Sequence, residues 1–463
     1  MNMSRELGAA LVADLRQLLG DRATTSRGVR EHHGKDESYF PYALPDAVVF
    51  PQSTEEVRDT VNLCRRYHTP IIPFGAGTSV EGHVLATGGG VCIDMSRMNK
   101  ILSVHDEDLD ATVQAGVTRK QLNEEIRHTG LFFPIDPGAD ATLGGMAATR
   151  ASGTNAVRYG TMRENVLALT VVTADGRIIK TARRARKSAA GYDLTRLFIG
   201  SEGTLGIITE VTARLYAVPE AMSAAVCLFK DIAGAVRTVI QTLQAGIPIA
   251  RSELLSPATI RAINMHCEMS YKEQPTIFFE FHGTEHGVVE QARLVQEIAK
   301  EHGGENFQWA TRSEDRNRLW AARHQAYPAT LQLRPGTRPF VTDVCVPISR
   351  LTECVVETMR DIDKASMPIP VFGHVGDGNF HCVILVRPGS ESDLAEAQAF
   401  NARLIERALA LEGTCTGEHG IGLGKLNWLR KEHGEGVDWM VAIKRAFDPD
   451  NLLNPGKVVA LEA

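Results

Sequence analysis

The chain has 463 residues, of which 43% are hydrophobic and 23% charged; this composition is ordinary for a globular protein and excludes a wholly disordered one. Its 50 basic and 56 acidic residues give a net charge of -6, and such a mild acidic balance argues against nucleic acid as the main partner. At about 150 residues per domain, the length allows two or three domains. No apolar run approaches the roughly 18 residues of a membrane span, so no transmembrane segment is expected.

Cysteine usage and the first residues bear on the cellular compartment. The eight cysteines are scattered and form no C-x-x-C pair, which excludes the common zinc-ribbon, ferredoxin and c-type haem spacings. The pattern predicts reduced, mostly buried thiols. Residues 1–20 include Arg5, Asp14 and Arg16, which predicts an amphipathic helix rather than a signal peptide. We therefore expect a cytoplasmic protein, or one held peripherally on the inner face of a membrane.

The first half of the chain alternates short apolar runs with glycine-rich loops. Ser53 and Glu56 have the spacing of a capping box, before a helix whose apolar face carries Val57, Val61 and Cys64. A strand, this helix, a second strand and a glycine loop follow one another, which is typical of α/β organisation with a ligand site at the strand end. A second helix is expected at residues 118–129. Strands are expected at residues 46–50, 69–74, 90–94, 101–104, 111–114, 166–173, 177–180 and 205–215, with 166–173 and 177–180 forming a hairpin.

Two stretches of the first half show no periodicity. Residues 137–160 are rich in Gly, Ala and Thr and fit neither a helix nor a strand. A loop of that length inside a compact domain is usually functional or disordered, and its small apolar residues favour function. The polar stretch with His32, His33 and Lys35 predicts only a solvated surface.

Beyond Pro219, which marks a plausible domain boundary, strands and helices alternate in the pattern of an α+β sandwich with helices on one sheet face. Strands are expected at residues 224–229, 251–255, 276–282 and 339–346, and helices at 232–245, 288–302, 313–333 and 350–365.

The glycine loops lack the familiar nucleotide fingerprints. Gly75 and Gly77 begin a dinucleotide motif, but Val80 stands where its third glycine is required. Gly424 and Lys425 resemble the end of a P-loop but are not followed by Ser or Thr. The small residues of loops 73–79 and 137–155 would still allow backbone amides to converge on a pyrophosphate. A tight turn is the alternative for either loop alone.

Histidines and a carboxylate gather in two glycine-rich segments of the second half. His374 and His381 lie seven residues apart, and glycines at 376 and 378 can turn both rings toward one point. Glu418 and His419 stand between further glycines. Two histidines and a glutamate make an ordinary divalent metal site, and His419 would then act as a base near neutral pH. The alternative is a set of structural histidines.

The first half resembles the flavin-binding domain of the vanillyl-alcohol oxidase and p-cresol methylhydroxylase superfamily, over residues 73–79, 137–160 and 200–209. The resemblance implies that the first two segments cradle the FAD pyrophosphate and that the third lies along the isoalloxazine. Some relatives tether FAD covalently through a histidine where this chain has Thr78, which implies non-covalent FAD. The implied FAD-binding residues are Pro73, Gly75, Ala76, Gly77, Thr78, Ser79, Pro137, Gly138, Thr142, Leu143, Gly144, Gly145, Ser152, Gly153, Asn155, Tyr159, Glu202, Gly203, Ile208 and Asn454.

Residues 373–381, 417–422 and 454–457 resemble the FAD-linked D-2-hydroxyacid dehydrogenases, and most of all their cytochrome- or quinone-linked D-lactate group. The implied fold class is α+β. A p-cresol methylhydroxylase-type FAD-binding domain would span residues 1–218, and a ferredoxin-like α+β substrate and metal domain residues 219–425. Residues 426–463 would return to the FAD domain.

The same resemblance implies roles for the clustered residues. His374, His381 and Glu418 would bind zinc or manganese, His419 would be the base, and Arg323 would meet the substrate carboxylate. Without the resemblance, Arg323 could equally form an ion pair on a helix surface.

The implied function is FAD- and metal-dependent oxidation of D-lactate, or a related small D-2-hydroxyacid, with electrons passed to an external cytochrome c or quinone. The 2-hydroxyglutarate branch carries polar residues where this chain has Val341, Tyr327 and Val383, which favours a small or apolar substituent. The alternatives are a D-2-hydroxyglutarate or glycolate dehydrogenase, an oxidase that uses O2, and a flavin- and metal-binding protein without turnover.

Overall fold

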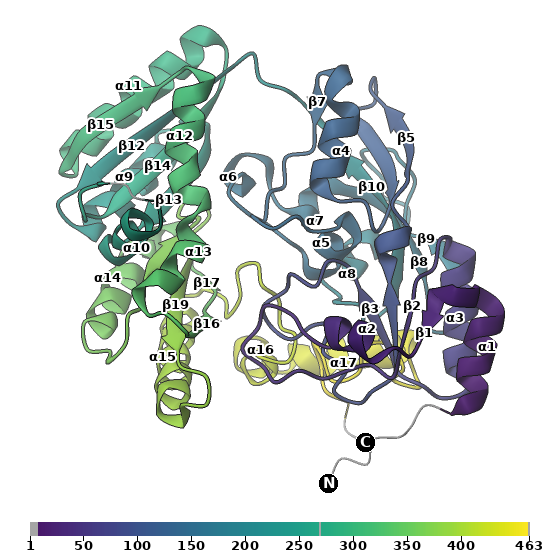
Figure 1. Cartoon of the computed structure of the whole chain (residues 1–463). Helices are drawn as coiled ribbons and strands as arrows, with labels where there is room; N and C mark the ends of the chain where they lie inside the picture. Colours follow the sequence, from purple (N-terminus) through teal and green to yellow (C-terminus); the bar gives the residue numbers. More distant parts are fainter. Residues whose placement is uncertain (1–7, 268–269, 462–463) are drawn as a thin grey trace. The chain divides into compact units, whose positions relative to one another are not determined.

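The computed structural model describes residues 8–267 and 270–461, and the chain divides into two compact units. Unit 1 comprises Met1–Ser152, Gly160–Val218 and Glu418–Ala463, and unit 2 comprises Gly153–Tyr159 and Pro219–Gly417. Figure 1 shows unit 1 in purple and blue, from the start of the chain, and in yellow, from its end. The domain boundaries after residues 218 and 425 remain a prediction.

A four-stranded sheet of unit 1 has the order β1-β2-β4-β3, in which β2, β4 and β3 are parallel. Its strands are β1 (Ala23–Thr24), β2 (Ala47–Val49), β3 (Ile71–Phe74) and β4 (Val91–Asp94). Helices α1 (Ala9–Leu19) and α3 (Thr54–Arg66) bury apolar faces in the same core. Residues 1–7 of the expected N-terminal helix lie outside the described residues. Ser53 caps α3 as predicted, whereas Glu56 accepts from the amide of Gln52, so only half of the predicted capping box forms.

The second sheet of unit 1 is antiparallel, with the order β5-β6-β10-β8-β9, and contains the predicted hairpin. Its strands are β5 (Ile101–His105), β6 (Asp110–Gln114), β8 (Val166–Val172), β9 (Ile178–Lys180) and β10 (Ile207–Arg214). The short strands β7 (Leu131–Phe132) and β11 (Tyr216–Ala217) pair with each other. The remaining helices of unit 1 include α2 (Arg27–His33), α4 (Arg119–Glu125), α5 (Leu143–Thr149), α7 (Met162–Asn165), α8 (Leu194–Phe198), α16 (Leu426–His433) and α17 (Gly436–Phe447).

The end of the chain completes unit 1. Leu453 forms a parallel bridge with Ile71 of β3. Lys444 of α17 is buried, and its Nζ donates to the carbonyls of Thr204 at 2.9 Å and Leu453 at 2.8 Å and also pairs with Asp448. Segments more than 200 residues apart in the sequence are thereby joined in one core.

Two predictions for the first half are wrong. Residues 137–160 contain helices α5 and α6 (Ala156–Tyr159). Thr142 caps α5 by accepting from the Gly145 amide, and Leu143, Met146 and Ala147 pack into the core. His33 is not on a solvated surface. It is 3% exposed, and its Nε2 lies 2.7 Å from Asp94 Oδ2.

Unit 2 is built on an eight-stranded sheet with the order β15-β12-β14-β13-β18-β19-β16, in which β17 also pairs with β19. Its strands are β12 (Ala221–Phe229), β13 (Ile249–Leu255), β14 (Thr276–Gly283), β15 (Gly304–Ala310), β16 (Arg338–Val341), β17 (Val344–Cys345), β18 (Val371–Gly373) and β19 (Asn379–Val386). Its helices include α9 (Ile232–Gln244), α10 (Pro257–Cys267), α11 (Glu285–Glu301), α12 (Ser313–His324), α13 (Ala326–Thr330), α14 (Leu351–Ile362) and α15 (Glu391–Ala410).

Helices cover both faces of this sheet, not the single face predicted. Val226 packs in one cluster with α10 and α12, whereas the next side chain along β12, Cys227, lies beside Gly304 and the end of α11. Successive side chains of a strand point to opposite faces, so these helices lie on opposite sides (Figure 1).

Two elements predicted as continuous are broken. The helix expected at 313–333 stops at His324, and α13 restarts at Ala326 with Pro328 in its first turn, where proline is tolerated. The strand expected at 339–346 divides into β16 and β17, with Thr342 and Asp343 between them.

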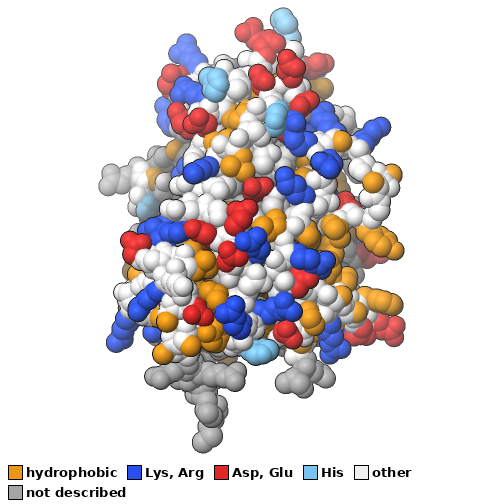
Figure 2. Space-filling model, turned by 90° about the vertical axis from the view of Figure 1, so that its right-hand side faces the viewer, with side chains coloured by type: hydrophobic (Ala, Val, Ile, Leu, Met, Phe, Trp, Pro, Cys, Tyr) orange, Lys and Arg blue, Asp and Glu red, His pale blue; other side chains and the backbone are white. Residues whose placement is uncertain are grey.

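Within residues 8–267 and 270–461, no helix has both the length and the hydrophobicity needed to cross a bilayer. All eight cysteines are described, no disulfide joins them, and burial raises the pKa of Cys64 and Cys382 to about 12. On the face drawn in Figure 2, basic and acidic side chains are interspersed, so that face offers no uniformly basic surface.

Candidate active site

A glycine-rich hairpin places two histidine rings side by side. His374 follows β18, and His381 pairs with Phe372 within β19. Gly378 makes the turn with φ +82°, and a Cβ there would lie 2.1 Å from the Val346 carbonyl oxygen, so only glycine fits. The centroids of the His374 and His381 rings are 5.6 Å apart. The break in strand regularity expected from the sequence therefore brings both rings together.

A buried carboxylate on β13 joins one of these histidines to Arg323. Glu253 has a fully buried side chain, and its Oε1 lies 2.7 Å from His374 Nδ1. Its Oε2 accepts from Arg323 Nε at 2.9 Å and from Nη2 at 2.7 Å. Burial alone would raise the pKa of Glu253, but His374 and Arg323 together lower it below its ordinary value. Because Nδ1 of His374 faces Glu253, its Nε2 is the nitrogen that would coordinate a metal.

Arg323 is therefore buried at 8% exposure, which excludes the alternative of a helix-surface ion pair. Its guanidinium carbon also lies 5.2 Å from the centre of the Phe372 ring. The two hydrogen bonds to Glu253 use Nε and Nη2, and Nη1 takes part in neither. The assignment of Arg323 to the substrate carboxylate stays a prediction. The substrate would have to bind at the outer edge of the guanidinium, the edge that carries Nη1.

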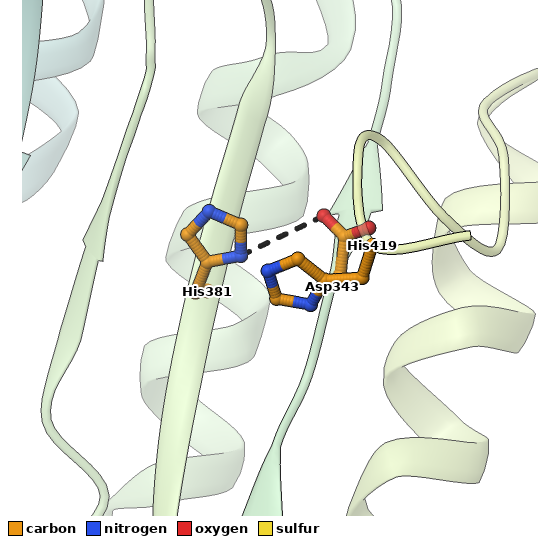
Figure 3. A group of neighbouring side chains, drawn as sticks. All are labelled: Asp343, His381 and His419. Carbon is orange, nitrogen blue, oxygen red and sulfur yellow. Dashed lines mark ion pairs between the residues drawn. The ribbon is translucent and has the colours of Figure 1, made fainter. Parts of the chain in front are cut away.

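Asp343, in the break between β16 and β17, contacts the side chains around His381. Its side chain is fully buried and accepts from Asn379 Nδ2 and Thr416 Oγ1, each at 2.7 Å. His381 Nδ1 lies 3.2 Å from the Thr342 carbonyl oxygen and 3.6 Å from Asp343 Oδ1 (Figure 3). As for His374, Nε2 of His381 is the nitrogen that would coordinate a metal.

Glu418 and His419 directly follow a glycine that packs against the side chains of this cluster. A Cβ on Gly417, the last residue of unit 2, would lie 2.2 Å from Asn379 Nδ2 and 3.2 Å from Asp343 Oδ1, so the backbone fits closely against these side chains. Glu418 and His419 follow directly, and Figure 3 shows His419 beside Asp343 and His381.

Two sets of side chains have the composition of a metal site. His374, His381 and Glu418 form one, and Asp343, His381 and His419 the other, with one possible ligand atom per residue and all such atoms within 4.8 Å of one another. Histidine nitrogens and carboxylate oxygens are ligands that a divalent ion such as zinc accepts, so either set has suitable donor atoms. The first set is the predicted one.

The predicted FAD loops converge within unit 1. A Cβ on Gly75, in the loop after β3, would lie 2.5 Å from Thr142 Oγ1 at the start of α5. The third segment packs on the same helix, since Glu202 donates its amide to the Ala148 carbonyl at 2.8 Å and Gly200 to that of Ala147 at 2.9 Å. Small residues thus bring three backbone segments together, which is an arrangement suited to a pyrophosphate.

Several predicted FAD residues have other contacts in the structure. Asn454 donates to the carbonyls of His83 and Glu202, and Ile208 lies in the hydrophobic core. Glu202 accepts from the amides of Ile421 and Gly422, at 2.7 and 2.8 Å, rather than standing open toward a ligand.

Gly153, Asn155 and Tyr159 belong to unit 2. Asn155 Oδ1 accepts from Arg251 Nε at 2.5 Å, and the Tyr159 hydroxyl lies 2.8 Å from His282 Nδ1. These side chains hold segment 153–159 against β13 and β14, and their contact with FAD remains a prediction.

Sequence reasoning missed the carboxylates behind the histidines. Glu253 is a charged residue in the otherwise apolar end of β13, and Asp343 interrupts a predicted strand; both irregularities were visible in the sequence.

Sequence reasoning also missed His83, which is buried with its Nε2 3.2 Å from Glu202 Oε2. Burial lowers the pKa of His83, but Glu202 and other acidic neighbours raise it further, so the net shift is upward.

Comparison with known proteins agrees with this architecture. The C-terminal domain of FAD linked oxidases matches residues 218–458, and an FAD binding domain matches residues 45–182. The chain is 53% identical to a probable mitochondrial D-lactate dehydrogenase of Danio rerio, over 97% of this chain and 92% of the relative. It is 47% identical to the mitochondrial D-lactate dehydrogenase [cytochrome] of Arabidopsis thaliana, over 98% and 81%.

More distant relatives include another oxidase of hydroxyacids and a solved structure with the same fold. A glycolate oxidase subunit of Bacillus subtilis is 37% identical over 91% of this chain and 90% of the relative. The solved structure of p-cresol methylhydroxylase with bound substrate has a TM-score of 0.79 at 19% identity, covering 97% of this chain and 96% of the other, which supports the fold alone. With two matching domains in sequence and close relatives over nearly the whole chain, the protein belongs to the family of FAD-linked oxidases.

Proposed function

We propose that the protein oxidises D-lactate, or a similarly small D-2-hydroxyacid, to the 2-oxoacid, using FAD and a divalent metal and passing electrons to a cytochrome or quinone. The observation that carries the proposal is one buried carboxylate, Glu253, which links a metal-ligand histidine to an arginine in a chain closely similar to D-lactate dehydrogenases. A metal ligand, His374, and a residue that can bind a carboxylate, Arg323, are thereby held close together. This arrangement suits a substrate with a hydroxyl group next to its carboxylate.

The residues have distinct roles in this reaction. Arg323 would bind the substrate carboxylate with the edge of its guanidinium that Glu253 does not occupy. His419 would take the proton of the C2 hydroxyl. His374, His381 and Glu418 would hold zinc or manganese, and the loops around Gly75 and Thr142 would hold FAD. The ion would supply Lewis acidity and the flavin a hydride acceptor.

The FAD should be non-covalent, because Thr78 stands where some relatives carry a linking histidine. Denaturing the purified protein should release yellow flavin into the supernatant after the chain is precipitated. An absorbance spectrum of both fractions measures this. Flavin that stays with the precipitate would contradict the argument from Thr78.

The surroundings of Arg323 favour a monocarboxylic substrate. Val341, Tyr327 and Val383 belong to one hydrophobic cluster with Phe372, which lies against the Arg323 guanidinium. A second substrate carboxylate beside these side chains would be buried without a partner, which is costly.

We therefore expect the highest kcat/KM for D-lactate, followed by D-2-hydroxybutyrate, with L-lactate, glycolate and D-2-hydroxyglutarate much lower. Steady-state assays with an artificial electron acceptor would measure all five. A clear preference for the dicarboxylate would overturn the pocket argument, and a preference for L-lactate would overturn the expected handedness.

The similarity to a glycolate oxidase subunit keeps glycolate as the second candidate. Anaerobic bleaching of the flavin with the same acids separates either activity from a binding protein without turnover, in which no acid would bleach the flavin. The acceptor is proposed from the relatives named as cytochrome-linked. The same relatives are mitochondrial, so the cytoplasmic location expected from the sequence has no support among them.

A further inference from the structure

We propose that Glu253 is a positioning residue that fixes the metal-ligand face of His374 and the substrate-binding edge of Arg323 at the same time. This inference rests on the proposed function and deepens it, because it assigns a positioning role to a residue that belongs to neither candidate metal set.

The register of the sheet places Glu253 for this role. Leu254 of β13 pairs with Gly373 of β18, so the neighbouring residues Glu253 and His374 come opposite each other in the antiparallel pair. Arg323 approaches from α12, which packs on the face of the sheet that carries Leu255 and Phe372. Side chains from α12 and from the residue after β18 thus meet the carboxylate that β13 carries.

Both oxygens of that carboxylate are used, and each by a different partner. Oε1 faces His374 Nδ1 at 2.7 Å, and Oε2 accepts both Arg323 bonds, at 2.9 and 2.7 Å. The contact requires a proton on Nδ1 of His374, which leaves the lone pair on Nε2 for an ion. The same carboxylate holds one edge of the guanidinium, so the outer edge with Nη1 keeps one orientation.

Burial makes the arrangement rigid. The Glu253 side chain is 0% exposed and those of His374 and Arg323 are 9% and 10% exposed. A glutamine at position 253 would keep the size of the side chain but would place an NH2 group against either the His374 N–H or the Arg323 donors. One of the two partners must therefore lose its acceptor.

The test compares Glu253→Gln with Glu280→Gln. Glu280 is a matched control because it is also buried in unit 2 and also pairs with a histidine and an arginine, namely His282 and Arg251. Zinc affinity is measured by chelator competition on metal-free, FAD-loaded protein. We expect Glu253→Gln to weaken zinc binding about 10–100-fold, the usual effect of removing a carboxylate behind a histidine ligand, and Glu280→Gln to leave it unchanged. At saturating zinc, Glu253→Gln should also raise KM for D-lactate.

The outcomes separate this inference from the proposed function. If the unmodified protein binds no zinc and no manganese, the proposed metal site fails. If it binds zinc and Glu253→Gln weakens binding no more than Glu280→Gln, the inference is wrong. Should Glu253→Gln not fold, the nitrogen-15 spectrum of His374 in the unmodified metal-free protein decides instead. A proton on Nδ1 is expected, and a ring protonated on Nε2 alone would overturn the inference.

Discussion

Replacing His381 with alanine should remove the metal and lower the rate of flavin reduction by about 10²–10³-fold or more, while FAD stays bound. The expected loss follows from the several kcal/mol that a Lewis acid contributes to such a reaction. FAD should remain because its predicted loops, around Gly75 and Thr142, belong to unit 1, whereas His381 lies in β19 of unit 2. Metal analysis, the flavin spectrum and stopped-flow reduction by D-lactate measure the three quantities.

A chelator should reproduce the effect of this variant, and added zinc or manganese should restore activity in the unmodified protein only. His282→Ala is the matched control, since His282 is equally buried in the sheet of unit 2 but belongs to neither candidate metal set. Full activity in a preparation shown to be free of metal would reject the metal site.

Replacing His419 with alanine should lower the rate of flavin reduction by about 10²–10⁴-fold, the usual contribution of a positioned base. The metal content should stay near normal, because Glu418 is assigned as the ligand. The geometry makes this a sharp test, since His419 also belongs to the second candidate set, with Asp343 and His381.

The companion variant Glu418→Gln should lose metal where His419→Ala keeps it. Stopped-flow reduction and metal analysis of both variants distinguish the two arrangements. If His419→Ala loses the metal and Glu418→Gln keeps it, then His419 is the metal ligand. The metal site would then be the second set, with Asp343 and His381.

The sequence predicted those parts of the protein whose local pattern determines the structure. Most strands and helices had apolar periodicity, and glycines 376 and 378 indicated that His374 and His381 could face one point. Helix α5 was missed because its seven residues are too few for a clear periodic pattern and include two glycines, which are poor helix formers. Its start depends on Thr142, which is recognised as a cap only once the helix is known.

The hydrogen-bond partners of the buried histidines could not be predicted, for a different reason. Glu253 reaches His374 across 121 residues of sequence, and His33 reaches Asp94 across 61. Such pairs depend on which strands become neighbours in a sheet, and no local pattern specifies that order. A buried charge requires a partner, so Glu253 next to the apolar end of β13 indicated that one existed but not which residue it was.

The order of synthesis has an unusual consequence for this chain. The core of unit 1 includes the bridge between Ile71 and Leu453 and the bonds from Lys444 to Thr204 and Leu453. Domains usually complete their folding in the order in which the ribosome makes them. Here all of unit 2 has been translated before Lys444 and Leu453 emerge, so the flavin-binding half begins first and is completed last. A ribosome that stalls after unit 2 has emerged but before Lys444 and Leu453 emerge would leave that half without its closing contacts.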